Sequence, residues 1–125
     1  MILITTVMRI LIADDNDMVR RGVRRLLSEE PDWIVCGEAK DGSEAIQKAR
    51  ELLPDVILLD ISMPGASGLD VARRLRQDLP KAKLLIISQH DPLLMLPQAI
   101  EAGCDGCLDK NRLATDLVAT IKYLR

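Results

Sequence analysis

The stretch that decides the fold is VILLDISMPGASG, residues 56–68. Its first four residues are continuously apolar, which is typical of a strand buried on both faces of a parallel sheet. The strand ends at a carboxylate, Asp60, and is followed by a segment that contains Ser62, Pro64 and Gly65. In a parallel α/β sheet, functional sites form at the carboxyl ends of the strands, so we examined the other strands for similar endings.

Apolar runs of the same kind recur at broadly regular intervals on either side of this segment. The five predicted strands are residues 9–13, 33–38, 56–60, 83–88 and 106–108. Helical patterns lie between them. After the first strand, Val19, Val23 and Leu27 recur at the spacing of one helix face. Asn16 or Asp17 can cap the start of this helix.

The later helices have recognisable boundaries. Ser43 is the candidate N-cap of the second helix, which Pro54 stops, and Pro80 closes the third. The last helix is expected over about residues 112–124.

The fourth helix is expected to be shorter than the others. Pro97 lies inside an apolar stretch, residues 93–100, and proline is tolerated best in the first turn of a helix. We therefore predict that this helix begins near Pro97 and ends at Gly103.

Five strands that alternate with five helices predict an α/β domain with a doubly wound parallel sheet and right-handed crossovers. For five strands we predict the flavodoxin-like order 2-1-3-4-5. Residues 8–125 are assigned to this domain. Residues 1–7 are assigned to an N-terminal extension, because a start at Met8 would suffice.

Composition narrows the function classes. The chain has 125 residues, 48% of them hydrophobic, which is enough for one core without disulfides. The net charge of −2 argues against direct nucleic-acid binding by this domain. No apolar run approaches the roughly 18 residues of a membrane span, and we find no signal peptide. A cytoplasmic location is the default expectation.

Polar residues follow the ends of the predicted strands. Asp14 and Asp15 come after the first strand, Asp60 and Ser88 end the third and fourth, and Lys110 follows the fifth. Because the carboxyl ends of parallel strands meet at one edge, we expect these side chains to converge. The simpler interpretation is that the acids only cap helices and that the lysine is solvated.

A cluster of three carboxylates needs a cation. Two such charges about 5 Å apart repel by about 3 kcal/mol at an effective dielectric constant near 20. A set of oxygen ligands without His or Cys favours Mg²⁺ over zinc. A carboxylate such as Asp60 can also attack phosphorus. Lys110 and Ser88 could then neutralise and hydrogen-bond the phosphoryl oxygens.

These residues lie in motifs that resemble the receiver domain of two-component response regulators. The motifs are ILIADD at residues 10–15, the segment 56–68, Ser88, and AGCDGCLDK at residues 102–110. The resemblance covers essentially residues 8–125. The wider pattern, which includes PDWIVCGEAKDG at 31–42 and GLDVARRLR at 68–76, is similar to the NarL/FixJ class.

The resemblance implies a role for each strand-end residue. Asp60 would be the phosphoacceptor, Lys110 would pair with the phosphoryl group, and Ser88 would be the switch hydroxyl. The Mg²⁺ ligands would be Asp15, Asp60 and the backbone carbonyl of Ser62, with Asp14 acting through water. One position departs from the family, which usually has an aromatic residue three places before the lysine. Here that residue is Cys107, so the resemblance does not extend to the aromatic half of the switch.

The resemblance also implies partners. A sensor histidine kinase would donate the phosphoryl group, and the face made by helix 4, strand 5 and helix 5 would then control transcription through a C-terminal helix-turn-helix domain. The family uses the same face for homodimers. The domain would be a signalling module and not an enzyme. Two alternatives stay open, an interaction module without phosphorylation and a haloacid dehalogenase-type phosphatase, which would need a general acid at Ser62.

Four further features have more than one interpretation. Cys104 and Cys107 form a C-x-x-C, but without a second ligand pair we interpret them as small packing residues. A solvated basic face is favoured over kinase docking for the first-helix arginines, Arg20, Arg21, Arg24 and Arg25. Leu93, Leu94, Met95 and Leu96 either fill the core or form an association patch. His90, the only histidine, is given no role.

Overall fold

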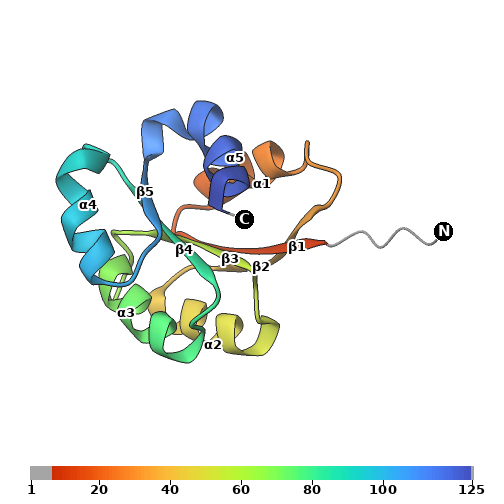
Figure 1. Ribbon diagram of the computed structural model, residues 1–125. Helices are drawn as coiled ribbons and strands as arrows, with labels where there is room; N and C mark the ends of the chain where they lie inside the picture. The colour runs from red at the N-terminus through yellow and green to blue at the C-terminus, as the bar shows by residue number, and fades with distance from the viewer. Residues whose placement is uncertain (1–6, 125) are drawn as a thin grey trace.

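Five parallel strands alternate with five α-helices in residues 7–124, the part of the chain that the computed structural model describes (Figure 1). The elements in chain order are β1 (Met8–Ala13), α1 (Asp17–Leu27), β2 (Trp33–Ala39), α2 (Gly42–Leu52), β3 (Val56–Asp60), α3 (Gly68–Asp78), β4 (Lys83–Ser88), α4 (Pro92–Glu101), β5 (Gly106–Asp109), the 3₁₀ turn η1 (Lys110–Arg112) and α5 (Leu113–Leu124). Of the predicted N-terminal extension, residues 1–6 lie outside the described residues, so its assignment stays a prediction.

The strands form one parallel sheet in the order β2-β1-β3-β4-β5, which confirms the predicted flavodoxin-like topology. Each predicted strand is present, and three of them are one residue longer than expected. Helices α1 and α5 cover one face of the sheet, and α2 and α3 cover the other (Figure 1). None of the helices in the described residues is long and apolar enough to cross a membrane.

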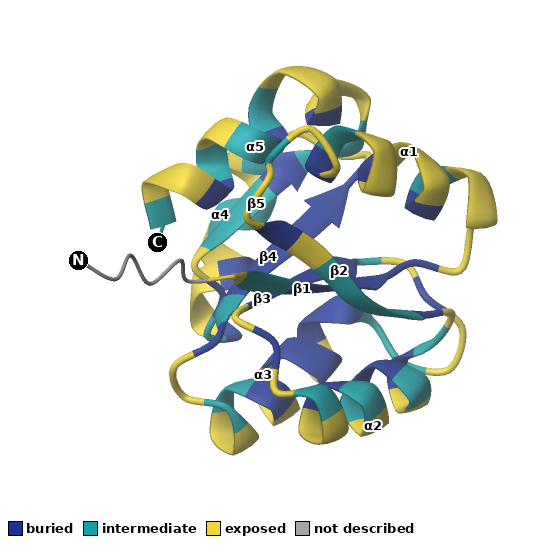
Figure 2. Ribbon diagram, turned by 90° about the vertical axis from the view of Figure 1, so that its right-hand side faces the viewer, coloured by how far each residue is buried: buried dark blue, intermediate teal, exposed yellow. Residues whose placement is uncertain are grey.

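The core lies on both faces of the central strands, as the continuously apolar runs predict. Alternate residues of β3 point to opposite faces, so Ile57 packs towards α2 and α3 while Leu58 packs towards α1 and α5. Both side chains have no exposed surface. The burial pattern in Figure 2 shows the same arrangement, with buried strands between helices whose outer faces are exposed. The two-sided burial explains why β1 and β3 lack an alternating polar pattern.

The helix caps agree with the sequence for α1 but not for α2. The Asn16 side chain accepts hydrogen bonds from the amides of Met18 and Val19, as predicted for an N-cap. The prediction of Ser43 as the cap of α2 is wrong. Asp41 caps this helix, and its carboxylate accepts a hydrogen bond of 2.8 Å from the Glu44 amide. Asp41 has the extended backbone that an N-cap requires, whereas Ser43 already lies inside the helix.

The predicted start of α4 is also wrong. The helix begins at Pro92, five residues earlier than expected, and Asp91 caps it by accepting a hydrogen bond from the Leu93 amide at 2.9 Å. Pro92 takes the first-turn position that we assigned to Pro97. Pro97 therefore lies inside the helix, where it lacks an amide to donate to the carbonyl of Leu93. The Asp91 cap and the first-turn position of Pro92 both favour the helix, so α4 forms although Pro97 leaves one hydrogen bond unmade.

We expect Pro97→Ala to stabilise the domain by about 1–2 kcal/mol, because it restores a helical amide and removes the ring clash. Thermal unfolding followed by circular dichroism measures the effect. Pro92→Ala is the matched control, and we expect no gain there because a first-turn proline loses no helical hydrogen bond. Equal melting temperatures for wild type and Pro97→Ala would mean that Pro97 does not strain α4.

Candidate functional site

The candidate site lies at the carboxyl edge of the sheet, where four neighbouring strands end. Asp60 is the last residue of β3, and Asp14 directly follows β1. Ser88 ends β4, and Lys110 directly follows β5. The register pairs Asp60 with Ile87 and therefore places Ser88 beside the end of β3. The parallel topology thus gathers residues that are up to 96 positions apart in the sequence (14 to 110).

The carboxylates converge around the lysine. Carboxylate oxygens of Asp14, Asp15 and Asp60 lie within 4.8 Å of one another. The Nζ atom of Lys110 lies 3.1 Å from Oδ2 of Asp14 and 3.4 Å from Oδ2 of Asp60. Asp14 and Asp60 are buried, with 2% and 3% of their surface exposed, whereas Asp15 is exposed. The site is a half-open acidic pocket with one cation at its wall.

The donor set fits a divalent cation. Three carboxylates and one ammonium leave a formal charge of −2 at this edge. Oδ2 of Asp14 is buried and receives no well-directed hydrogen bond from any described residue, even though Lys110 is adjacent. The Lys110 ammonium, 3.1 Å from this buried oxygen, is shared with Asp60, so a further cationic ligand would stabilise the oxygen. Oxygen donors alone, with an exposed carboxylate open to water, suit Mg²⁺.

The surroundings of Asp60 and Lys110 shift the pKa values of both side chains. Burial, followed by the charge of Asp14, raises the pKa of Asp60, and the Ser62 amide and Lys110 offset this only in part. Burial lowers the pKa of Lys110, but the adjacent Asp14 carboxylate, followed by Asp60, outweighs burial and raises the pKa overall. Lys110 therefore stays charged at neutral pH, while the ionised form of Asp60 is destabilised in the pocket without a bound cation.

Comparison with known proteins gives the same family as the motifs. Residues 10–122 match the model of the response regulator receiver domain. The chain belongs to the response regulator receiver family. Over 118 residues it is 36% identical to the response regulator GacA of Pseudomonas viridiflava, and over 103 residues 42% identical to the transcriptional activator protein ExaE of Pseudomonas putida. These alignments cover 93% and 82% of this chain but only 54% and 48% of the relatives, so this receiver spans about half of their length.

Solved receiver structures agree in detail with the fold. A two-component response regulator of the LuxR family from Aurantimonas sp. SI85-9A1 superposes with a TM-score of 0.89 at 34% identity, covering 95% of this chain and 85% of that chain. The signal receiver domain of NarL from Mycobacterium tuberculosis gives 0.87 at 38% identity, with 95% and 96% covered. This receiver is therefore of the LuxR/NarL type.

One arginine of the receiver was placed wrongly from the sequence. Arg21, Arg24 and Arg25 are exposed, as a solvated basic face requires, but Arg20 is buried with 7% of its surface exposed. The spacing of the buried residues in the first helix could have predicted the burial of Arg20. Arg20 precedes Val23 by three residues and Leu27 by seven, which is the spacing of the buried face of α1.

The cysteines do not form a second site. Cys104 is buried and Cys107 half-buried, and both pack against the core on the α2 and α3 side of the sheet. Burial raises the pKa of Cys107 and raises that of Cys104 to about 12. The thiolates that zinc binding or redox exchange would need are therefore disfavoured. The interpretation of the C-x-x-C as packing residues is supported.

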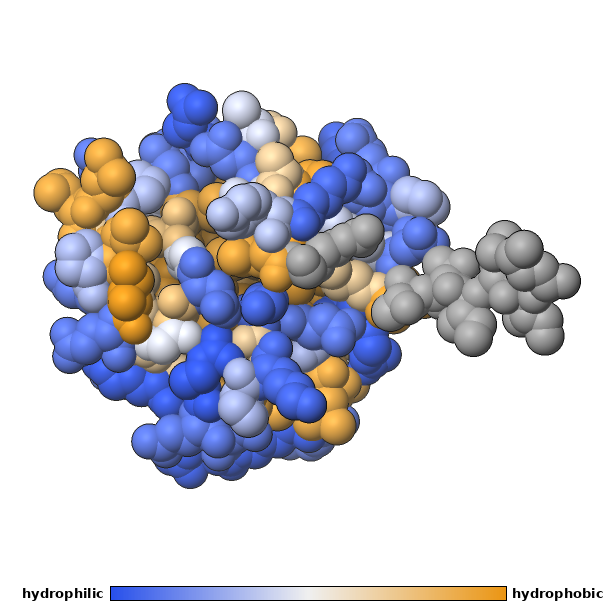
Figure 3. All heavy atoms as spheres, viewed as in Figure 1, coloured by the Kyte–Doolittle hydropathy of each residue, from blue (hydrophilic) through white to orange (hydrophobic). Residues whose placement is uncertain are grey.

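Helix α4 packs Ala99 into the core but presents several large apolar residues to solvent. Leu93, Leu94 and Ile100 are 77%, 72% and 61% exposed. Helix α4 lies at the left of Figure 1, and Figure 3, in the same view, shows hydrophobic surface on that side. Leu93 and Leu94 do not fill the core, whereas Met95 and Leu96 are half-buried and Met95 packs against it. The association patch stays a prediction for the two exposed leucines.

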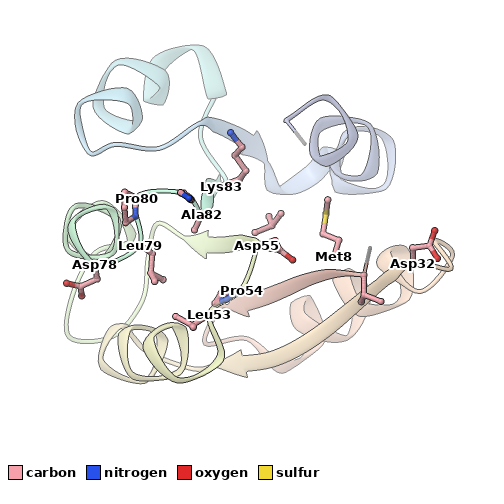
Figure 4. Close-up of a pocket in the computed structure, with 13 residues that line it drawn as sticks. Met8, Asp32, Leu53, Pro54, Asp55, Asp78, Leu79, Pro80, Ala82 and Lys83 are labelled. Atoms are coloured by element: carbon pink, nitrogen blue, oxygen red, sulfur yellow. The ribbon is translucent and has the colours of Figure 1, made fainter. Parts of the chain in front are cut away.

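A separate groove of about 740 Å³ lies at the opposite edge of the sheet (Figure 4). Its walls come from the starts of β1, β3 and β4 and from the turns before them, and include Met8, Pro54, Leu79 and Ala82. The groove contains none of the strand-end residues named above. It is therefore separate from the acidic pocket.

We expect Asp60→Asn to stabilise the Mg²⁺-free domain by about 1 kcal/mol at pH 7, or roughly 4 °C in melting temperature. The pKa of Asp60 is raised in the folded state, so its ionised form opposes folding above that pKa. The gain should shrink as the pH falls through the raised pKa and vanish below the ordinary pKa of an aspartate, because Asp60 is then protonated in both the folded and the unfolded chain. Chemical denaturation at several pH values tests this, and a destabilised variant at pH 7 would contradict it.

Proposed function

We propose that this receiver accepts a phosphoryl group on Asp60, in a Mg²⁺-dependent reaction, from a sensor histidine kinase. The observation that carries the proposal is the position of the Asp60 carboxylate. It lies at the carboxyl end of β3, 3.4 Å from the Lys110 ammonium and beside the carboxylates of Asp14 and Asp15. A nucleophile, a cation and metal-binding oxygens are thereby collected in one pocket.

The proposed metal ligands are Asp15, Asp60 and the backbone carbonyl of Ser62, with Asp14 acting through water. Bound Mg²⁺ would supply positive charge to neutralise both the carboxylates and the incoming phosphate. The buried Oδ2 of Asp14, whose ion-pair partner Lys110 also serves Asp60, and the net negative charge of the cluster support this assignment.

The chain's own residues divide the remaining work. An oxygen of Asp60 forms the new bond to phosphorus while the bond to the kinase histidine breaks, which leaves an acyl phosphate. Lys110 pairs with the phosphoryl oxygens as a point charge. The Ser88 hydroxyl accepts a hydrogen bond of 3.0 Å from the His90 amide, so its own proton is available for the phosphoryl group.

The proposed output is transcriptional control through a C-terminal helix-turn-helix domain. This is supported by the relatives, which are about twice as long as the chain and include a transcriptional activator. Phosphorylation would shift the face made by α4, β5 and α5, where the exposed apolar residues of α4 suit an output domain or a homodimer. Cys107 stands at the aromatic switch position, so Ser88 would switch without a ring beside it. A cytoplasmic location stays a prediction.

The test is labelling with acetyl phosphate and Mg²⁺, followed by intact-protein mass spectrometry. Wild type should gain the mass of one phosphoryl group, and Asp60→Asn should gain none because the nucleophile is missing. Asp32→Asn is the matched control, since Asp32 is exposed near the opposite edge of the sheet and should leave labelling unchanged.

Two results would redirect the proposal. No labelling of wild type would favour an interaction module that keeps the fold without the chemistry, whereas turnover of a generic phosphate ester would favour a phosphatase. Labelling of Asp60→Asn at the wild-type level would show that Asp60 is not the acceptor.

A further inference from the structure

Arg20 is a buried cation that none of the roles above uses. Its side chain is 8% exposed and lies between the start of α1, the end of β1 and the end of β2. Burying a charge is costly unless every donor finds a partner. The contacts of Arg20 therefore indicate what its burial achieves.

The guanidinium group contacts three elements at once. Nη1 donates to the backbone carbonyl of Asp14 at 2.7 Å. Nε donates to Oε1 of Glu38 at 3.0 Å, and Nη2 donates to Oδ1 of Asp17, also at 3.0 Å. The two carboxylates balance the positive charge. The only bond to Asp14 is to its carbonyl, so Arg20 leaves the Asp14 carboxylate free to face the pocket.

Asp14 is consequently held on several sides. Its amide donates to the carbonyl of Ala39 in β2 at 3.0 Å, and its carbonyl accepts from Arg20. Its Oδ1 accepts a hydrogen bond of 2.8 Å from the amide of Asn16, the N-cap of α1. The short loop that carries Asp14 and Asp15 is thereby tied to both β2 and α1.

We propose that Arg20 is a positioning residue that holds the Asp14–Asp15 loop in the geometry needed to bind the divalent cation. The inference rests on the proposed function, because it assumes that these carboxylates bind Mg²⁺. The guanidinium is suited to the task since its rigid fork can hold a carbonyl and two carboxylates simultaneously. A metal site depends on groups that fix the orientation of its ligands as well as on the ligands themselves.

A residue that acts only through its charge would affect Mg²⁺ binding in the opposite direction to a positioning residue. Removing a positive charge near three carboxylates should strengthen Mg²⁺ binding by Coulomb attraction alone. Loss of positioning should weaken it. The sign of the change in Mg²⁺ affinity therefore separates the two roles, and a change in stability without a change in affinity would indicate a merely structural one.

The chain offers a matched control in Arg24. It donates to the other oxygen of Glu38, at 3.1 Å, but does not contact Asp14, and its side chain is 46% exposed. Arg24→Met removes the same charge as Arg20→Met and breaks a bond to the same carboxylate. It leaves the bond to the Asp14 carbonyl in place.

The experiment is calorimetric titration of the domain with MgCl₂, accompanied by acetyl phosphate labelling at increasing Mg²⁺ concentrations. We expect Arg20→Met to raise the Mg²⁺ dissociation constant about tenfold, and to raise the Mg²⁺ needed for half-maximal labelling in proportion. Arg24→Met should stay within about twofold of wild type, as expected for an exposed ion pair.

Unchanged or tighter Mg²⁺ binding by folded Arg20→Met would overturn the inference, while wild type that binds Mg²⁺ and is labelled on Asp60 would leave the proposed function standing. Wild type that neither binds Mg²⁺ nor is labelled would refute both. If circular dichroism shows that Arg20→Met does not fold, Arg20→Lys decides. Its ammonium is a compact point charge without the planar fork that spans the three partners, so we expect severalfold weaker Mg²⁺ binding, and wild-type affinity would refute the positioning role.

Discussion

The mutual repulsion of Asp14, Asp15 and Asp60 is the constraint on which the functional edge of this domain depends. A parallel sheet brings the carboxyl ends of β1 and β3 together. Asp60 ends β3, and Asp14 and Asp15 directly follow β1. Without a bound cation, the repulsion among these carboxylates therefore opposes folding. Lys110 relieves part of the repulsion, but it serves two carboxylates with one charge. The remaining negative charge makes the pocket receptive to a divalent ion.

Holding like charges together requires a rigid frame, and the rest of the domain supplies it. The strands that end at the pocket are buried on both faces by aliphatic side chains. Around the loop after β1, the amide and carbonyl of Asp14 are bonded to Ala39 and Arg20. The energy for keeping the carboxylates close thus comes from packing and hydrogen bonds elsewhere in the domain, as is common for functional sites.

Local sequence patterns predicted the elements well where local chemistry decides them. The buried strands followed from continuous apolar runs, and the Asn16 cap followed from its position before α1. Predictions were wrong where two residues competed for one local role. Asp41 and not Ser43 caps α2, and Pro92 and not Pro97 occupies the first turn of α4. In each case the residue nearer the preceding strand prevailed, so the helix begins earlier than predicted.

The sequence by itself determined the order of strands and helices, the family, and the residues at each strand end, because these depend on periodicity and on short motifs. Only the tertiary structure decided that Arg20 donates to the Asp14 carbonyl, that one ammonium, Lys110, pairs with both Asp14 and Asp60, and that Leu93 and Leu94 are exposed. The physical reason is the separation along the chain of the residues that determine each property. Periodicity is a property of neighbouring residues, whereas the surroundings of a charged or apolar side chain depend on segments that are distant in the chain.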